Sequence, residues 1–192
     1  MDYTSRIEKA TGGSAGDNVY GCTGKNVLAG GGNIGGSIDQ MADLGGYDQQ
    51  GIKLPSSSDV YTGFKADSGT MVLDTGGKGD LLNLGAFNSK GVDLYRYDAN
   101  NDRSANSLLI LFDGAFEPDE LRGVAVVNQF GSDWPFSFNG KVEKIQFRNK
   151  TISPKAGSLD PLPVQNEAAV EALLPGARDA GSDAPLLGLS EE

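Results

Sequence analysis

The sequence predicts an all-β protein in which a short glycine-rich, β-roll-like coil packs on an antiparallel β-sandwich, followed by a tail with one short helix. Three observations predict this class. Glycine accounts for 28 of the 192 residues, about twice its average usage. A nine-residue glycine pattern repeats near the N-terminus. Short apolar segments separated by turn-forming residues then recur between residues 71 and 152.

The glycine pattern starts at Gly12 and follows Gly-Gly-x-Gly-x-Asp-x-aliphatic-x, a calcium-binding nonapeptide. Three consecutive blocks and one distant echo fit it to different degrees: GGSAGDNVY (12–20), GCTGKNVLA (21–29), GGGNIGGSI (30–38) and TGGKGDLLN (75–83). The aspartate position is occupied by Asp17, Asn26 and Asp80. Glycines permit the φ > 0 turns that close each coil, and aspartate and carbonyl oxygens are the ligands that calcium prefers.

Two interpretations of the opening blocks remain open, a calcium coil and a flexible glycine-rich loop. Asn26 can bring calcium only a neutral oxygen, whereas Asp17 brings charge. If no metal binds, the Asn26 amide can instead donate and accept hydrogen bonds between stacked turns. Fewer than three good repeats cannot bury a solenoid core unaided, so another part of the chain must support the coil.

Residues 33–70 are rich in Gly, Ser, Asp and Gln. We expect a long surface excursion here, with one short helical turn around residues 38–44. Loops of this length are usually functional or disordered. We therefore expect the features that are unique to this protein to lie in this region.

The expected β body covers residues 71–152. Its predicted strands are 71–74, 80–84, 93–97, 107–112, 123–130 and 142–147. The runs SLLILF and VAVV are continuously apolar, as in strands that are buried on both faces. Trp134 and Phe136 are expected to fill the core of the sandwich.

The order of these segments resembles the C-terminal module of haemolysin-type calcium-binding (RTX) proteins. The matching runs are DTGGKGDLLNLGAF, DLYRYD, NSLLILFDG, VAVVNQF and VEKIQF. The family's last two strand patterns are occupied by Asn128, Phe130, Glu143, Ile145 and Phe147. The resemblance covers residues 12–32 and 71–152, and it implies calcium-dependent folding after type I secretion, guided by an uncleaved C-terminal signal. The chain departs from the family in its few repeats, in Asn26 and in the unmatched residues 33–70.

A second group of oxygen donors lies in the segment DANNDRS. Asp98, Asn100 and Asp102 alternate as at the start of an EF-hand loop, which makes them further candidate calcium ligands. Arg103 and Leu109 stand where that loop needs glycine and glutamate. We favour the simpler interpretation of this segment, a polar hairpin that connects two strands.

Residues 153–192 form the expected tail, after a first domain that covers residues 1–152. Its composition shifts to Pro, Ala, Leu and acidic residues, and residues 166–174 have an N-cap and helix-forming residues. Two interpretations stay open, a linker with a docking helix and a secretion signal.

Composition disfavours several classes of function. The net charge of −10 disfavours nucleic acid and anionic membranes, and no segment has the run of about 18 apolar residues that a membrane span needs. The chain has no histidine, and its single cysteine, Cys22, cannot form an internal disulfide. Its first residues are not those of a cleaved signal peptide.

We therefore expect a secreted, non-enzymatic, calcium-stabilised structural or adhesive protein, whose partners are calcium and either further copies of itself at the cell surface or a surface component. The alternatives are the C-terminal module of a larger secreted enzyme and a carbohydrate-binding β-sandwich.

Overall fold

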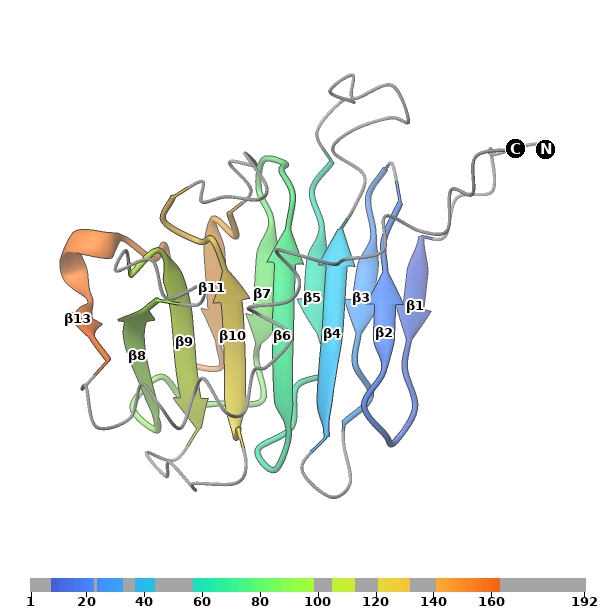
Figure 1. Ribbon diagram of the computed structural model, residues 1–192, viewed down its shortest axis with the longest axis horizontal. Helices are drawn as coiled ribbons and strands as arrows, with labels where there is room; N and C mark the ends of the chain where they lie inside the picture. Colours follow the sequence, from blue (N-terminus) through green and yellow to red (C-terminus); the bar gives the residue numbers. More distant parts are fainter. Residues whose placement is uncertain are drawn as a thin grey trace.

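The computed structural model describes residues 8–22, 24–32, 37–43, 57–98, 105–112, 121–131 and 141–162. Within these ranges the chain forms β-strands and one 3-10 helix, η1 (Ala156–Ser158), arranged in two sheets (Figure 1). The predicted all-β class is confirmed. The sandwich on which the coil was expected to pack was predicted to be antiparallel; instead, both sheets mix parallel and antiparallel pairs.

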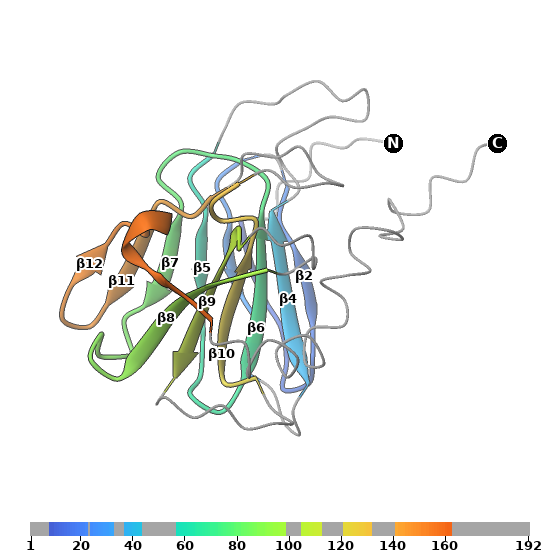
Figure 2. The ribbon, with the colours of Figure 1, turned by 60° about the vertical axis from the view of Figure 1, so that its left-hand side comes forward.

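The strands divide between two layers, which Figure 2 shows side by side. The first sheet has the spatial order β1 (Lys9–Thr11), β3 (Val27–Ala29), β5 (Val60–Thr62), β7 (Leu81–Leu84), β11 (Lys144–Phe147) and β12 (Thr151–Ile152). The second has the order β13 (Asp160–Pro161), β8 (Val92–Tyr97), β9 (Ser107–Phe112), β10 (Gly123–Val127), β6 (Gly69–Asp74), β4 (Ile38–Asp43) and β2 (Asn18–Tyr20).

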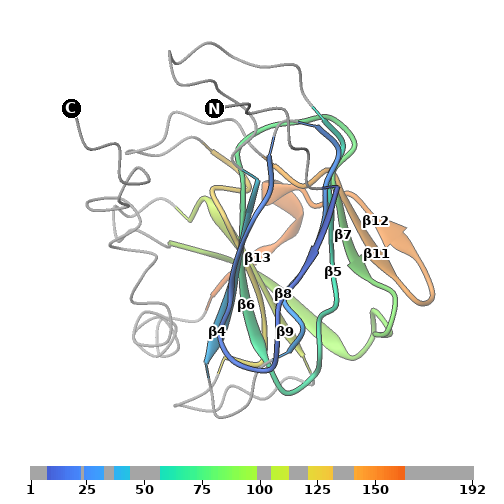
Figure 3. The same cartoon turned by 90° about the vertical axis from the view of Figure 1, so that its right-hand side faces the viewer.

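Consecutive strands from β1 to β7 alternate between the two sheets. Within each sheet these strands pair in parallel, β1 with β3, β3 with β5 and β5 with β7 in one, and β2 with β4 and β4 with β6 in the other. Each turn of the chain therefore adds one strand to each sheet. Figure 3 looks along this stack and shows the two layers edge-on.

The later strands extend the same two sheets. Strands β8, β9 and β10 form an antiparallel meander, but β10 then lies parallel to β6, and β11 lies parallel to β7. Each sheet is mixed because its later strands include antiparallel pairs, while β10 and β11 lie parallel to the coil strands β6 and β7. Strand β12 closes a hairpin with β11.

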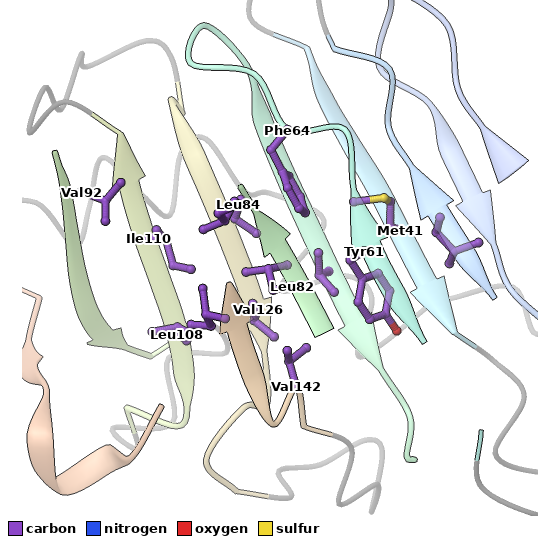
Figure 4. Close-up of a cluster of buried hydrophobic side chains, with 14 of the residues drawn as sticks. Met41, Tyr61, Phe64, Leu82, Leu84, Val92, Leu108, Ile110, Val126 and Val142 are labelled. Atoms are coloured by element: carbon purple, nitrogen blue, oxygen red, sulfur yellow. The ribbon is translucent and has the colours of Figure 1, made fainter. Parts of the chain in front are cut away.

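The main core lies between the sheets, where side chains from both layers meet (Figure 4). Strand β9 is buried along its whole length: Leu108 and Ile110 belong to this core, and Leu109 and Leu111 belong to a second cluster. The prediction that SLLILF is buried on both faces is therefore confirmed, and its predicted bounds coincide with those of β9. The segment predicted as 123–130 ends earlier, at Val127, because Asn128 takes the left-handed backbone conformation with φ of 56°.

The expectation of a surface excursion across residues 33–70 is wrong for its described residues. The helical turn expected around residues 38–44 is not formed by its described residues; Ile38–Asp43 is strand β4, and strand β5 and the start of β6 follow. The segment forms a strand because Met41 is buried in the core. Asp39 is buried as well, and its carboxylate accepts a hydrogen bond from the backbone N–H of Asp17. Buried aspartates made this strand look like a polar loop. Residues 33–36 and 44–56 lie outside the described residues.

Part of the expected tail also folds onto the second sheet. Strand β13 pairs in parallel with β8, and Leu162 is buried in the second cluster. The predicted helix at residues 166–174 lies outside the described residues, as do Trp134 and Phe136.

Candidate metal centre

An aspartate or an asparagine stands two positions before the buried side chain of the coil strands β2, β3, β4, β5 and β7. The pairs are Asp17 and Val19, Asn26 and Leu28, Asp39 and Met41, Asp59 and Tyr61, and Asp80 and Leu82. Glu143 precedes Ile145 of β11 in the same way. Because strands alternate between sheets, these polar residues fall on two opposite edges of the coil. The first edge carries Asp17 and Asp39, and the second edge carries Asn26, Asp59, Asp80 and Glu143.

Side chains on the second edge form a hydrogen-bonded ladder that links successive turns. The N–H of Asn26 donates to Oδ1 of Asp59 at 2.6 Å, and the N–H of Asp59 donates to Oδ1 of Asp80 at 2.7 Å. The N–H of Asp80 in turn donates to Oε2 of Glu143 at 2.8 Å. Each carboxylate thus satisfies a backbone donor of the preceding turn, which a buried edge requires.

Asn26 uses its amide entirely within the protein. The side chain is fully buried, its Nδ2 donates to the carbonyl of Cys22 at 2.7 Å and to that of Gly24, and its Oδ1 accepts the N–H of Cys22 at 3.2 Å. Nδ2 also lies 3.3 Å from Oδ1 of Asp59 in the next turn. This geometry matches the interpretation in which the amide bridges stacked turns rather than contacting a metal.

Asp80 on this edge has one oxygen without a hydrogen-bond partner. Its side chain is fully buried, Oδ1 accepts the N–H of Asp59, and Oδ2 has no hydrogen-bond partner. Burial, followed by the negative charges of Asp74, Glu143 and Asp59, raises the pKa of Asp80 to about 8. A carboxylate in this position therefore needs either a proton or a cation near neutral pH.

Asp74, at the end of β6, adds a further buried carboxylate to the second edge. Its Oδ1 accepts the N–H of Gly76 at 2.9 Å, and its Oδ2 accepts the hydroxyl of Tyr61 at 3.0 Å. Burial raises the pKa of Asp74 to about 6 against the opposing effect of these two hydrogen bonds. Burial and the neighbouring carboxylates also raise the pKa of Tyr61, which therefore stays a protonated donor.

Two oxygens of Asp80 and the carbonyl oxygen of Ser57 lie close to Gly77, which is in the turn between β6 and β7. A Cβ on this glycine would lie 2.5 Å from Oδ2 and 2.8 Å from Oδ1 of Asp80, and closer still to the carbonyl oxygen of Ser57. A glycine at this position therefore lets one carboxylate and one carbonyl pack closely against the backbone. Calcium binds such oxygens at about 2.3–2.6 Å and completes six to eight ligands with carbonyls and water.

The described residues contain no group of three or more acidic or cysteine side chains that could hold a metal ion by themselves. An ion at Asp80 would thus depend on backbone carbonyls and water for most of its ligands. The residues present fit a hard cation in the chemistry of their donors and in the unpartnered Oδ2.

The first edge is different because its carboxylates already have partners. Asp17 accepts the N–H of Gly13 at 2.5 Å, and Asp39 accepts the N–H of Asp17 at 3.1 Å. Burial and the Asp17 charge raise the pKa of Asp39, whereas the N–H groups of Asp17 and Gly32 and the Lys65 ammonium oppose that rise. The side chain of Lys65 lies over Gly32, with Nζ 2.7 Å from where a Cβ would be.

The six predicted ligands therefore do not form one site. Asp17 lies on the first edge, and Asn26 and Asp80 lie on the second. Asp98 follows β8, which β9 and β10 separate from the coil strand β6. Asn100 and Asp102 lie outside the described residues.

The sequence analysis did not identify Asp39, Asp59 and Asp74 as residues of these edges. It also did not identify Glu143 as a neighbour of Asp80. A signal for three of them was present, since IDQM, SDVY and VEKI each place an acidic residue two positions before a large apolar one. It went unnoticed because those segments lack the glycines of the nonapeptide. Asp74 has no such signal, because only the packing of the two sheets brings it to this edge, where it meets Tyr61 of β5.

Comparison with protein-family models, with curated proteins and with solved structures finds no match. Among the described residues, no helix is long and apolar enough to cross a membrane.

Proposed function

We propose that this chain is a calcium-stabilised structural protein of RTX-like type, in which β1 to β7 form a short β-roll capped by the strands that follow. The observation that carries this proposal is Asp80, a fully buried carboxylate with an unpartnered oxygen among three other carboxylates. A divalent cation bound only by the native state stabilises it by mass action. The protein would then fold fully where calcium is abundant, as it is outside cells.

Amide hydrogen exchange tests this role for calcium at the level of the coil. The N–H groups of Asn26, Asp59 and Asp80 join successive turns, so a cation that holds the second edge should slow their exchange. We expect slower exchange in peptides covering residues 57–84 with excess calcium than with chelator. Peptides covering β9 serve as the internal control. Equal exchange in both conditions for the coil peptides would contradict the proposal.

A structural role by self-association is supported by the open end of the coil. In the part of the chain that the structure describes, β1 pairs with β3 alone and β2 with β4 alone, which leaves one side of each strand for a further partner. Tyr20 on β2 is a large apolar side chain with 48% of its surface exposed. We propose that a second copy of the chain adds at this edge.

Sedimentation of the wild type and two variants tests this association. Tyr20→Lys places a charge on the edge strand and should shift the protein toward monomer, because edge lysines oppose strand addition. Tyr20→Phe keeps the apolar side chain and should preserve association. A wild type that stays monomeric at high concentration in calcium would contradict the self-assembly part of the proposal.

A further inference from the structure

The second sheet has an apolar outer face, on the side away from the first sheet. In β9, Leu108 and Ile110 belong to the main core, so the alternation of the strand directs Leu109 to the opposite face. There it lies beside Ala125 of β10. Leu109 and Ala125 are fully buried, whereas the outward side chains of a bare sheet contact water. A further layer of chain therefore covers this face.

The same face continues across β6. Met71 and Leu73 lie beside Ala125 and Val127 of β10, and Val72 between them points into the main core. Met71 is buried, and Leu73 and Val127 are half-buried. The second cluster, as far as its described members go, does not extend to these β6 side chains. Their cover must come from another part of the chain or from a partner.

The described chain ends at this face. Leu162 is buried in the second cluster, and its N–H donates to the carbonyl of Arg96 in β8 at 2.8 Å. Strand β8 lies next to β13, and β9, β10 and β6 follow in that order (Figure 1). Adjacent strands are about 4.8 Å apart, so β6 lies about 14 Å from β8. Residues 163–192 therefore start about three strands away from the uncovered part of the face.

A nine-residue segment of this tail has the pattern of an amphipathic helix. Residues 166–174 place Val170, Leu173 and Leu174 at i, i+3 and i+4, which is one face of a helix. Residues 163–165 can extend over about 10 Å, and a helix of nine residues is about 13 Å long. Together they reach from Leu162 to β10 and β6.

We propose that residues 166–174 form a helix that docks on the outer face of the second sheet of its own chain, over β10 and β6. Its three apolar side chains pack on Met71, Leu73 and Val127. A helix on one face of a sheet is a stable layer arrangement because both elements bury an apolar face. This docking relies on apolar burial, so it holds whether or not calcium binds.

Two other segments outside the described residues fit this face less well. Residues 113–120 carry four acidic side chains among eight residues, and charged groups are costly to bury against leucines. Residues 132–140 lie between Phe130 and Val142, which both pack in the main core on the opposite side of the sheet. The tail is the segment that starts on the outer face.

Paramagnetic broadening of amide signals tests where the tail lies. A nitroxide on Ala172→Cys, in a full-length Cys22→Ser protein, sits on the helix face opposite Leu173 and Leu174 and leaves the docking side chains intact. It should broaden the amide signals of β10 and β6 more strongly than those of β3 and β5 in the other sheet. Equal effects on both sheets, or none, would overturn the proposal.

A mixed sample separates docking within one chain from donation to a neighbour. Labelled protein is mixed with an isotope-enriched copy that carries no nitroxide, and only the enriched copy is observed. Its β10 and β6 signals should be unaffected. Broadening of these signals would show that the tail docks on a second copy, which contradicts docking within the chain.

Two lysine substitutions test the apolar contact itself. Leu173→Lys places a charge on the docking face, and Ala172→Lys places the same charge on the opposite face. At one fixed calcium concentration, we expect the first to lower the melting temperature by about 5–10 °C and the second by less than about 2 °C. Equal melting temperatures for the two variants would contradict docking through Leu173.

Discussion

The backbone N–H of Asp59 donates a 2.7 Å hydrogen bond to Oδ1 of Asp80, and this bond joins two successive turns of the coil. It uses one oxygen of the carboxylate and leaves Oδ2 buried without a partner. A hydrogen bond that stabilises the stack therefore holds an incompletely neutralised charge in the interior. The chemistry of the second edge follows from this arrangement.

The first prediction concerns the pH dependence of the metal-free protein. The pKa values of Asp74 and Asp80 are raised to about 6 and about 8, so the folded state binds protons more tightly than the unfolded state does. Their contribution to stability is complete below the ordinary aspartate pKa and is lost as pH rises through the folded values. In chelator, we expect the melting temperature to fall by on the order of 5–10 °C between about pH 5 and pH 8.5.

Asp80→Asn is the matched control, because it removes the group with the larger shift. Its melting temperature should fall less over the same interval. Thermal melts at closely spaced pH values measure both slopes. A wild-type melting temperature that rises throughout this interval, in parallel with that of the variant, would show that Asp80 is already ionised without metal.

The second prediction is that calcium binding releases a proton near neutral pH. At pH 7 a carboxyl group with a pKa of about 8 is largely protonated, and a cation must displace that proton to use the oxygen. Calorimetric titration in buffers of different ionisation enthalpy should give a release of about one proton per ion at pH 7. Binding heats that do not depend on the buffer would count against Asp80 as the ligand.

The third prediction concerns Asn26→Asp. The substitution removes the Nδ2 donors to the Cys22 and Gly24 carbonyls and places a negative charge beside Asp59. We expect a loss of about 1–3 kcal/mol in the free energy of unfolding, both with calcium and with chelator. Denaturant unfolding measures this loss. If the variant instead binds calcium more tightly than the wild type, the asparagine is the weak half of a metal site, as the opening blocks also allow.

The fourth prediction separates the folded part of the tail from the rest. Leu162 is 2% exposed, β13 pairs with β8, and Nε of Arg96 donates to the carbonyl of Leu159 at 3.2 Å. A chain that ends at residue 152 should be less stable than one that ends at residue 162, by about 1.5–3 kcal/mol for the burial of Leu162 alone. Composition predicts that the whole tail beyond Pro154 is dispensable for the β body, whereas strand β13 and Leu162 pack on that body. Equal unfolding curves for the two truncations would show that β13 does not contribute.

The sequence was most informative where apolar residues dominate. Strand β9 is predicted with its observed bounds because SLLILF is continuously apolar, and a run of this length between turn formers favours a buried strand. Strand β4 could not be recognised, because Asp39 and Asp43 occupy buried positions that are apolar in most strands. Only the neighbouring turn shows that Asp39 accepts a backbone donor, the N–H of Asp17.

The candidate site was predicted in part for a related reason. Asp80 was identified from the glycine pattern, but Asp59 lies in a segment without those glycines and reaches Asp80 through strand register. Asp74 and Asp80 are close in sequence, yet both oxygens of Asp74 are held by Tyr61 and Gly76, whereas Oδ2 of Asp80 has no hydrogen-bond partner. Local patterns do not specify contacts of this kind.

Thermal unfolding of the wild-type protein in excess calcium and after exhaustive chelation, at a pH of about 7.5, tests the central claim most directly. At a calcium concentration of about 100 times the dissociation constant, binding to the native state adds about 2.7 kcal/mol, which corresponds to a rise in melting temperature of about 5–11 °C. Magnesium at the same concentration should give a smaller rise, because it requires a near-ideal octahedron and dehydrates reluctantly. The same melting temperature in calcium and in chelator would contradict the account.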